Sequence, residues 1–167
     1  MIIEDTHGII FTGTGRTATI SRPAGAARMR TFLEQHNFNI EVVDYIDSFS
    51  NKELEDVCKR FIGPKTLFVG VSTTFLHDFE KVNHLLGYVK ENYPHIQTLF
   101  GGSETPMNGF DLTKVDRVFW GYAEEAMLHY LKFLTRKRLD DLPWYLWRNT
   151  KTINAEALYK KIGRAHV

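Results

Sequence analysis

The chain has 167 residues, and its 21 basic and 20 acidic side chains give a formal net charge of +1, which offers no electrostatic basis for binding nucleic acid or an anionic membrane. Hydrophobic residues make up 43% and charged residues 25%, as in globular rather than disordered chains. The single cysteine, Cys58, excludes an internal disulfide and an all-cysteine metal site, and without a signal-peptide pattern or a long apolar run we expect a cytoplasmic protein.

Short apolar runs alternate with helical patterns along the chain. Five runs rich in β-branched and aromatic residues are predicted as strands, at residues 8–15, 40–46, 66–72, 96–102 and 115–121. Four segments with apolar residues at helical spacing are predicted as helices, at residues 24–37, 52–62, 77–93 and 122–138. Such alternation is typical of βαβ units with right-handed crossovers. The sequence therefore predicts a doubly wound α/β domain with a five-stranded, mainly parallel sheet.

The connections carry signals of their own. Ser50, with Glu53 three residues later, has the pattern of a capping box before the second helix. Gly63 and Pro64 end that helix. Residues 103–114 are too few for a full helix between two strands, so we expect a loop or one turn there.

The pattern changes after the last predicted helix. Two short apolar runs, at 144–147 and 150–153, predict a hairpin or an extended linker that leaves the domain. We therefore expect one domain over residues 1–137 and a hairpin or linker over residues 138–161.

Small and polar residues follow four of the predicted strands, as TGTG, STTF, GGSE and GYAEE. In an open parallel sheet, ligands bind outside the carboxyl ends of the strands. Glycine there lets a ligand approach the main chain, but tight strand-to-helix turns need glycine whatever the function. One such turn is explained by the fold alone, whereas four at one edge indicate a binding pocket.

A nucleotide site is one interpretation of that pocket. The sequence has no GxxxxGK[ST] motif, and Arg22-Pro23 interrupt the first glycine-rich turn before a helix can begin. Asp44 follows the second predicted strand, where an acid can bind a ribose or simply cap the strand end. Both readings of Asp44 remain open.

Catalytic patterns are weak. The sequence has no GxSxG motif and no placed cysteine–histidine pair. His77 and His84 share a helical face, but no third metal ligand accompanies them. Glu124 and Glu125 follow Gly121 at a predicted helix start, where the helix dipole favours carboxylates. We therefore assign no catalytic residue and no metal-ligand set.

Four blocks, in order, resemble the N-terminal cobalamin-binding domain of cobalamin-dependent radical SAM enzymes. They are RPAGAARMRTFLEQHNFNIEVVDYI, FVGVSTTFL, TLFGGSETP and VDRVFWGYAEEAMLHYL. The later segment DDLPWYLWRNTKTIN is similar to the short hairpin that links such domains to the radical SAM barrel. The resemblance covers about residues 8–153 and implies a Rossmann-like or flavodoxin-like cobalamin-binding fold.

The resemblance implies that backbone and hydroxyl groups of the strand-end loops hold cobalamin, whose corrin ring is a wide and mostly apolar disc. The residues it implies are Gly13, Gly15, Arg22, Gly25, Ser72, Thr73, Thr74, Gly101, Gly102, Ser103, Gly121, Tyr122 and Glu124. By analogy Ser72 and Thr73 bond the lower tail of the cofactor, and Gly101-Gly102 let that tail pass close to the main chain. Glu124 either contacts the edge of the ligand or only caps its helix.

The sequence departs from related cobalamin patterns in two places. The D-x-H-x-x-G motif, whose histidine ligates cobalt in other cobalamin proteins, is missing, and Asp5-Thr6-His7-Gly8 has its glycine two places early. We therefore expect cobalamin without a histidine–cobalt bond. In the turn GYAEE, Tyr122 and Ala123 replace the acid and the glycine of the family pattern.

Radical SAM chemistry needs a CxxxCxxC motif that holds a [4Fe-4S] cluster and leaves one iron for S-adenosylmethionine. One cysteine cannot supply it, so we expect the cluster and S-adenosylmethionine only in a missing C-terminal barrel of the same full-length chain. The last six residues, IGRAHV, resemble a translated sequencing adapter. The expectation is a fragment that ends its own sequence at Lys161 and is not catalytic alone.

Two alternatives stay open. One is a nucleotide-binding Rossmann-like domain, supported by Asp44 and the first glycine-rich turn. The other is a ligand-free interaction module, since some members of the family keep the fold without binding cobalamin. The substrate and the transferred group are not specified by any of these residues.

Overall fold

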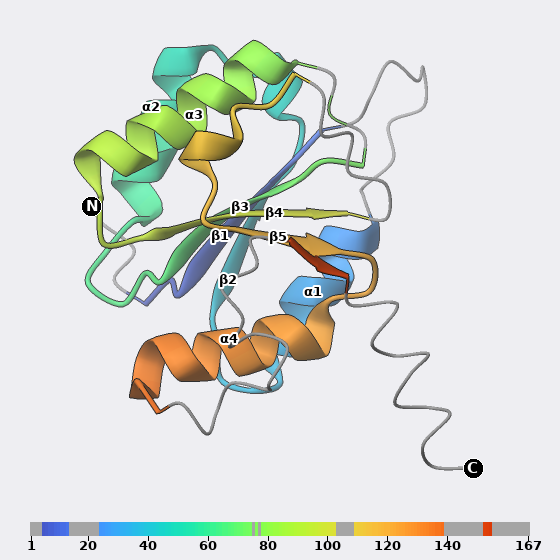
Figure 1. The fold of residues 1–167 in the computed structure, drawn as a ribbon. Helices are drawn as coiled ribbons and strands as arrows, with labels where there is room; N and C mark the ends of the chain where they lie inside the picture. The colour runs from blue at the N-terminus through green and yellow to red at the C-terminus, as the bar shows by residue number, and fades with distance from the viewer. Residues whose placement is uncertain are drawn as a thin grey trace.

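The fold comes from a computed structural model, which describes residues 5–13, 24–74, 76, 78–102, 109–138 and the backbone of 152–154. Within these ranges a single parallel sheet carries two α-helices on each face (Figure 1). The prediction of a doubly wound α/β domain is therefore confirmed.

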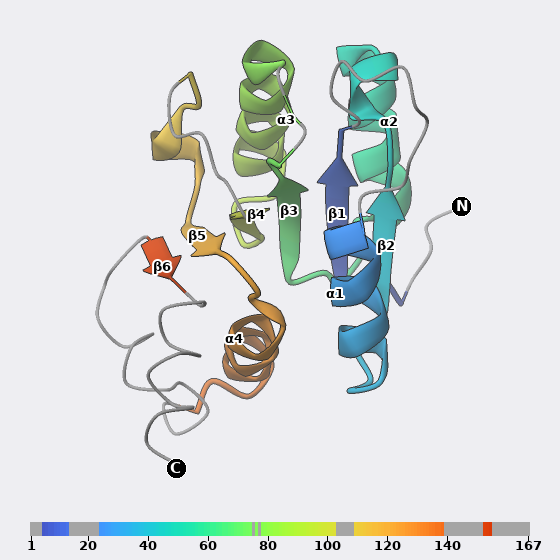
Figure 2. The ribbon, with the colours of Figure 1, turned by 90° about the vertical axis from the view of Figure 1, so that its right-hand side faces the viewer.

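The sheet has the strand order β2-β1-β3-β4-β5-β6, which Figure 2 shows from right to left. Its strands are β1 (Gly8–Thr12), β2 (Ile40–Val43), β3 (Phe68–Ser72), β4 (Gln97–Gly102), β5 (Arg117–Trp120) and β6 (Thr152–Asn154). All neighbouring pairs are parallel. The winding reverses between β1 and β3, and in such sheets ligands bind at this switch point, outside the carboxyl ends of the strands.

The short strand β6 makes the sheet one strand wider than the five predicted. It pairs in parallel with β5, and Asn154 lies opposite Trp120. The sequence suggested a hairpin or linker here, and the described part of that segment instead extends the sheet edge. The rest of the suggested hairpin, including residues 144–147, lies outside the described residues, so the hairpin stays a prediction.

The helices cover the two faces of the sheet in pairs. They are α1 (Ala24–Glu34), α2 (Asn51–Phe61), α3 (Phe79–Asn92) and α4 (Glu124–Arg136), with single 3₁₀ turns at Ile46–Ser48 and Leu112–Lys114. Helices α2 and α3 lie on one face, and α1 and α4 lie on the other (Figures 1 and 2). In the part of the chain that the structure describes, no helix has both the length and the apolar character needed to cross a membrane.

Local signals explain two helix boundaries. The Ser50 hydroxyl accepts a bond from Glu53 N at 3.2 Å, and the Glu53 carboxylate accepts one from Ser50 N at 2.8 Å, so the predicted capping box is confirmed. Helix α1 ends three residues before its predicted limit, because Asn37 adopts a left-handed φ of 66° and Phe38 N donates to Leu33 O at 3.0 Å.

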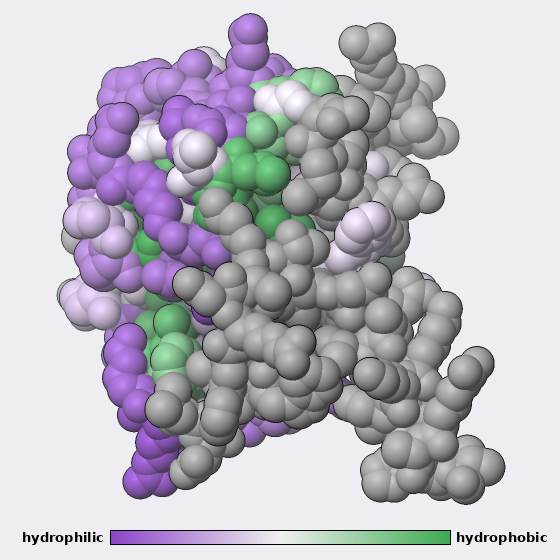
Figure 3. All heavy atoms as spheres, viewed as in Figure 1, coloured by the Kyte–Doolittle hydropathy of each residue, from purple (hydrophilic) through white to green (hydrophobic). Residues whose placement is uncertain are grey.

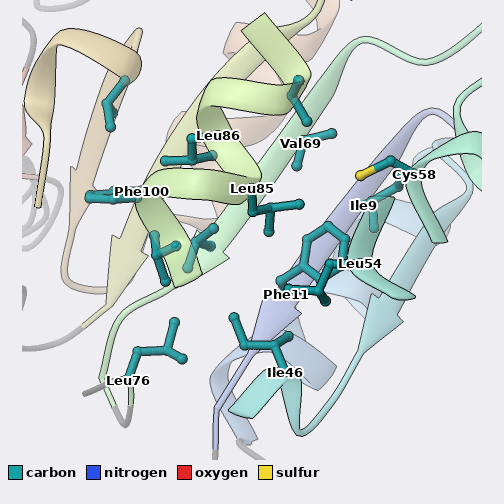
Figure 4. Close-up of a cluster of buried hydrophobic side chains, with 14 of the residues drawn as sticks. Ile9, Phe11, Ile46, Leu54, Cys58, Val69, Leu76, Leu85, Leu86 and Phe100 are labelled. Atoms are coloured by element: carbon teal, nitrogen blue, oxygen red, sulfur yellow. The ribbon is translucent and has the colours of Figure 1, made fainter. Parts of the chain in front are cut away.

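Strand alternation divides the core into two layers. On the face under α2 and α3, Phe11, Val69 and Phe100 pack against helical residues such as Leu54 and Leu85 (Figure 4). The outer side of these helices is mostly hydrophilic in the view of Figure 3, at its upper left. This half of the domain is therefore an ordinary packed layer.

The opposite face is packed at one end only. Phe68, Leu99 and Phe119 fill the layer under α1 and α4. Two residues further along β3 and β4, on the same face, stand Gly70 and Gly101. On this face the side chains are therefore smaller at the carboxyl ends of the central strands, and this leaves space beneath α1 and α4.

Candidate functional site

A cavity of about 500 Å³ occupies that space. Its walls come from β1, β3, β4 and β5 on one side and from the first turns of α1 and α4 on the other. The volume is in the range of small-molecule and cofactor sites. The cavity opens at the carboxyl ends of the strands, where the sequence predicts a binding pocket.

The inner wall of the cavity is apolar. Ile10, Phe68, Leu99, Phe119 and Met127 line it, and each is at most 8% exposed. These side chains pack against the sheet or α4, so they form a fixed wall. Such a wall suits a flat, apolar ligand group.

Two glycines at the carboxyl ends of the strands stand where the fold has room for a larger side chain. Among the described residues, a Cβ atom built on Gly25 would meet no heavy atom within 4 Å, and one on Gly101 would meet only the Phe119 carbonyl oxygen at 3.5 Å. Both residues line the cavity. Their own packing therefore does not require glycine, whereas a ligand that approaches the main chain does.

Other glycines predicted for the site are explained by the structure alone. A Cβ atom on Gly13 would come within 2.5 Å of Leu76 and 2.8 Å of Asp47, and Gly13 does not line the cavity. Gly102 and Gly121 have φ of 152° and 87°, which side chains rarely adopt. The Gly121 amide donates to the Gly102 carbonyl at 2.9 Å and joins the two loops.

The three hydroxyl residues after β3 divide into two groups. Ser72 and Thr74 line the cavity and are half-buried. Thr73 is 1% exposed and does not line it, and both its backbone amide and its hydroxyl donate to the Gly101 carbonyl, at 2.8 and 3.2 Å. Thr73 therefore fixes the position of the glycine loop, and Ser72 and Thr74 offer hydroxyls to a ligand.

Two charged side chains meet beside the cavity. Arg28 of α1 forms an ion pair of 2.9 Å with Glu124 of α4, and its guanidinium carbon lies 5.1 Å from the centre of the Tyr122 ring. All three residues line the cavity. The side chain of Glu124 is 16% exposed and that of Arg28 is 60% exposed, so the carboxylate lies inside and the guanidinium faces solvent.

Arg28 was missed by the sequence reasoning. It stands three residues after Gly25, so both residues lie near one face of α1. Gly25 is the glycine of the Arg-x-x-Gly pattern and was predicted to bind the ligand. The helical spacing between Gly25 and Arg28 could therefore have identified Arg28 as a second residue of the site. Among the predicted site residues, Gly15, Arg22 and Ser103 lie outside the described residues.

Asp44, the acid of the nucleotide alternative, lies away from the cavity. Asp44 accepts a hydrogen bond from the buried Thr12 hydroxyl at 2.8 Å, which ties the ends of β1 and β2 together. Asp44 does not line the cavity. This bond explains the acid at the strand end without a ribose.

Metal-binding side chains do not gather anywhere in the described ranges, where no three histidine, cysteine, aspartate or glutamate residues could hold one ion. His7 lies just before β1, at the amino ends of the strands and away from the cavity. Its Nδ1 accepts a hydrogen bond from Asn39 N at 2.9 Å. Burial raises the pKa of the Cys58 thiol to about 12, so this buried cysteine stays protonated and unreactive.

Comparison with known proteins gives a fold but no family. No family model matches the chain, and no curated protein matches it. Among solved structures, the chain is similar to the radical S-adenosylmethionine methyltransferase TsrM from Kitasatospora setae, with 14% identity and a TM-score of 0.59 over 80% of this chain. It is also similar to a cobalamin-binding protein from Desulfitobacterium hafniense DCB-2, with 16% identity and a TM-score of 0.53 over 79% of this chain.

These similarities have limits in length and in meaning. The chain spans 26% of the methyltransferase and 59% of the cobalamin-binding protein. It also resembles lysine decarboxylase A from Pseudomonas aeruginosa, with 16% identity and a TM-score of 0.50 over 85% of this chain and 19% of that enzyme. At such identities the resemblance establishes a shared α/β fold, and the ligand has to be argued from the cavity.

Proposed function

We propose that this chain binds cobalamin, as the cobalamin-binding domain of a radical SAM enzyme of the methyltransferase type. The observation that carries the proposal is the cavity at the strand ends. Gly25 and Gly101 leave main chain uncovered there, and the side chains behind them are apolar. A radical SAM methyltransferase and a cobalamin-binding protein among the solved structures with this fold support it.

The residues present fit the lower tail of cobalamin, which ends in a flat, largely apolar benzimidazole base. Phe68, Leu99 and Phe119 offer an apolar wall for that base. Ser72 and Thr74 offer hydroxyls to the polar groups of the tail, and Gly101 lets the tail lie against the main chain. The cavity of about 500 Å³ suits the tail, and the larger corrin ring would lie outside it over the strand ends.

When bound, cobalamin supplies a cobalt centre able to take part in methyl transfer or radical chemistry. This chain would bind and orient the cofactor, and the proposal assigns it no catalytic residue. A barrel with a CxxxCxxC motif, a [4Fe-4S] cluster and S-adenosylmethionine would complete the enzyme in the full-length chain. Reading the genomic DNA beyond the codon for Lys161 tests this part, and an open frame without a cysteine triad would contradict it.

Binding is tested with the 167-residue chain and hydroxocobalamin. We expect the visible absorbance of the corrin to co-elute with the protein in gel filtration, and calorimetry to give one site per chain. NAD and ATP serve as controls and should give no heat. A response to NAD or ATP without one to cobalamin would favour the nucleotide alternative.

A variant that fills the cavity makes the test specific to this site. Gly101→Leu adds a side chain from β4 into the cavity, at a position where a Cβ atom meets only an ordinary van der Waals contact among the described residues. We expect that the corrin no longer co-elutes with this variant, and that the variant unfolds at a temperature similar to that of the wild type. The matched control, Thr31→Leu, adds similar apolar bulk on α1 at an exposed residue outside the cavity. It should bind like the wild type.

The fold by itself does not specify a ligand, so the ligand-free module is the second candidate. In that case the protein serves as an interaction unit and the cavity has no cofactor. A folded protein that stays colourless after mixing with hydroxocobalamin would support this candidate over cobalamin binding.

A further inference from the structure

We propose that Arg28 binds the phosphodiester of the cobalamin lower tail at the mouth of the cavity, where its ion-pair partner Glu124 competes with the phosphate for the guanidinium. The inference rests on the proposed function and assigns a ligand group to a residue that the sequence patterns did not select.

Charge is the first argument. Among the described residues that line the cavity, Arg28 is the one cation and Glu124 the one anion. The lower tail carries a single negative charge, on the phosphodiester between its linker and its ribose. A phosphate removed from water without a cationic or hydrogen-bonding partner is strongly disfavoured. Arg28 is thus the cation available to this group within the described lining.

Position is the second argument. The inner wall is apolar, so the base of the tail belongs there and the phosphate belongs nearer the solvent. The Arg28 side chain is 60% exposed and starts from the first turn of α1, whereas its partner Glu124 is 16% exposed. The guanidinium therefore lies at the outer part of the cavity, where the phosphate of an inserted tail would pass.

Preorganisation is the third argument. The ion pair with Glu124 at 2.9 Å and the Tyr122 ring at 5.1 Å hold the guanidinium from two sides. A guanidinium has five N–H donors in a fixed plane, so it can keep one edge on a carboxylate and offer another to a phosphate. Glu124 and the phosphate nevertheless compete for the same positive charge.

A purely structural role is the rival explanation, because the ion pair also ties α1 to α4. The two explanations differ in what Glu124 does. If the pair only ties the helices, Arg28→Ala and Glu124→Gln should weaken ligand binding in parallel. If Arg28 binds the phosphate, removing the Glu124 charge should tighten cobalamin binding, while removing Arg28 weakens it.

The test measures dissociation constants of the 167-residue chain for cyanocobalamin and for dicyanocobinamide, which lacks the phosphate, ribose and base. We expect Arg28→Ala to weaken cyanocobalamin binding about tenfold, the loss of one charge-assisted bond, and to leave cobinamide binding unchanged. Arg28→Lys should recover part of the loss and Glu124→Gln should tighten cyanocobalamin. The affinity of the wild type should fall with added salt more steeply than that of Arg28→Ala.

Thermal unfolding of each variant separates these effects from misfolding. Three outcomes would overturn the inference and leave the proposed function intact. Arg28→Ala could lose the same affinity for both corrinoids, it could lose no affinity for cyanocobalamin, or its affinity could depend on salt as steeply as that of the wild type. If the wild type binds neither corrinoid, the proposed function itself fails and this inference falls with it.

Discussion

Ser72 at the end of β3 lies directly opposite Gly101 of β4 in the parallel register of the sheet. Both residues line the cavity on the face under α1 and α4. A hydroxyl therefore stands next to a strand position that has no side chain. This pair gives a ligand one polar contact and one close approach to the main chain within neighbouring strands.

Ser72→Ala should weaken cobalamin binding without lowering stability. The loss of one neutral hydrogen bond corresponds to about two- to tenfold in the dissociation constant. Calorimetric titration with hydroxocobalamin measures it, and Ser48→Ala, at an exposed serine in the 3₁₀ turn outside the cavity, serves as the control. Equal affinities for the wild type and Ser72→Ala would show that this hydroxyl makes no contact with the ligand.

Gly13→Ala and Gly25→Ala should have opposite effects on stability. At Gly13 the new methyl group would lie 2.5 Å from Leu76 and 2.8 Å from Asp47, and overpacking of this kind costs about 1–3 kcal/mol in the free energy of unfolding. At Gly25 the methyl group meets no atom of the described residues and replaces glycine within a helix, which favours the folded state by up to about 1 kcal/mol.

Urea unfolding of both variants checks this pair. Gly25→Ala also adds a methyl group to the cavity lining, so its cobalamin affinity should fall while its stability rises. A stabilised Gly13→Ala would mean that the loop after β1 moves freely away from Leu76, against the packing seen here.

The capping box of α2 should contribute measurably to stability. Ser50→Ala removes the acceptor for the Glu53 amide and leaves that donor to water, so the free energy of unfolding should fall by about 1 kcal/mol. Because the bonds between Ser50 and Glu53 are reciprocal, the losses of Ser50→Ala and Glu53→Ala should not be additive in a double-mutant cycle. Additive losses would indicate that the two bonds act separately.

His7 should make stability depend on pH. Burial is the main cause that lowers its pKa below 6.5, assisted by the charge of Lys65, and its Nδ1 must be unprotonated to accept from Asn39 N. As the pH falls below about 6.5, the unfolded chain binds a proton that the folded chain resists, so the free energy of unfolding decreases. His7→Gln should lack this part of the decrease in urea unfolding between pH 7 and 5, and an identical decrease in both proteins would contradict the assignment.

The sequence was sufficient to predict five of the strands and the four α-helices because each of these segments has a clear hydrophobic period. The β-branched run at Phe68–Ser72 and the Ser50–Glu53 pair are examples, and both lie where the residues indicated. Boundaries were less certain, since the end of α1 depends on Asn37 adopting a left-handed conformation. Strand β6 was not predicted as part of the sheet because three residues carry too little periodicity.

The candidate site was predictable where strand alternation alone decides the geometry. Phe68, Gly70 and Ser72 share one face of β3 and all line the cavity, whereas Thr73, the next residue along the chain, is buried and does not line it. Arg28 was not predictable in this way. Its role depends on the packing of α1 beside α4, which brings it to Glu124 across most of the length of the chain.

If the proposed function is correct, the unequal filling of the two sheet faces separates folding of the protein from binding of its cofactor. The layer under α2 and α3 is complete with protein side chains alone, so the polypeptide has a driving force to reach its native topology while vacant. A corrinoid could then be captured or exchanged at the other layer as a late event, without dismantling the half that supports it.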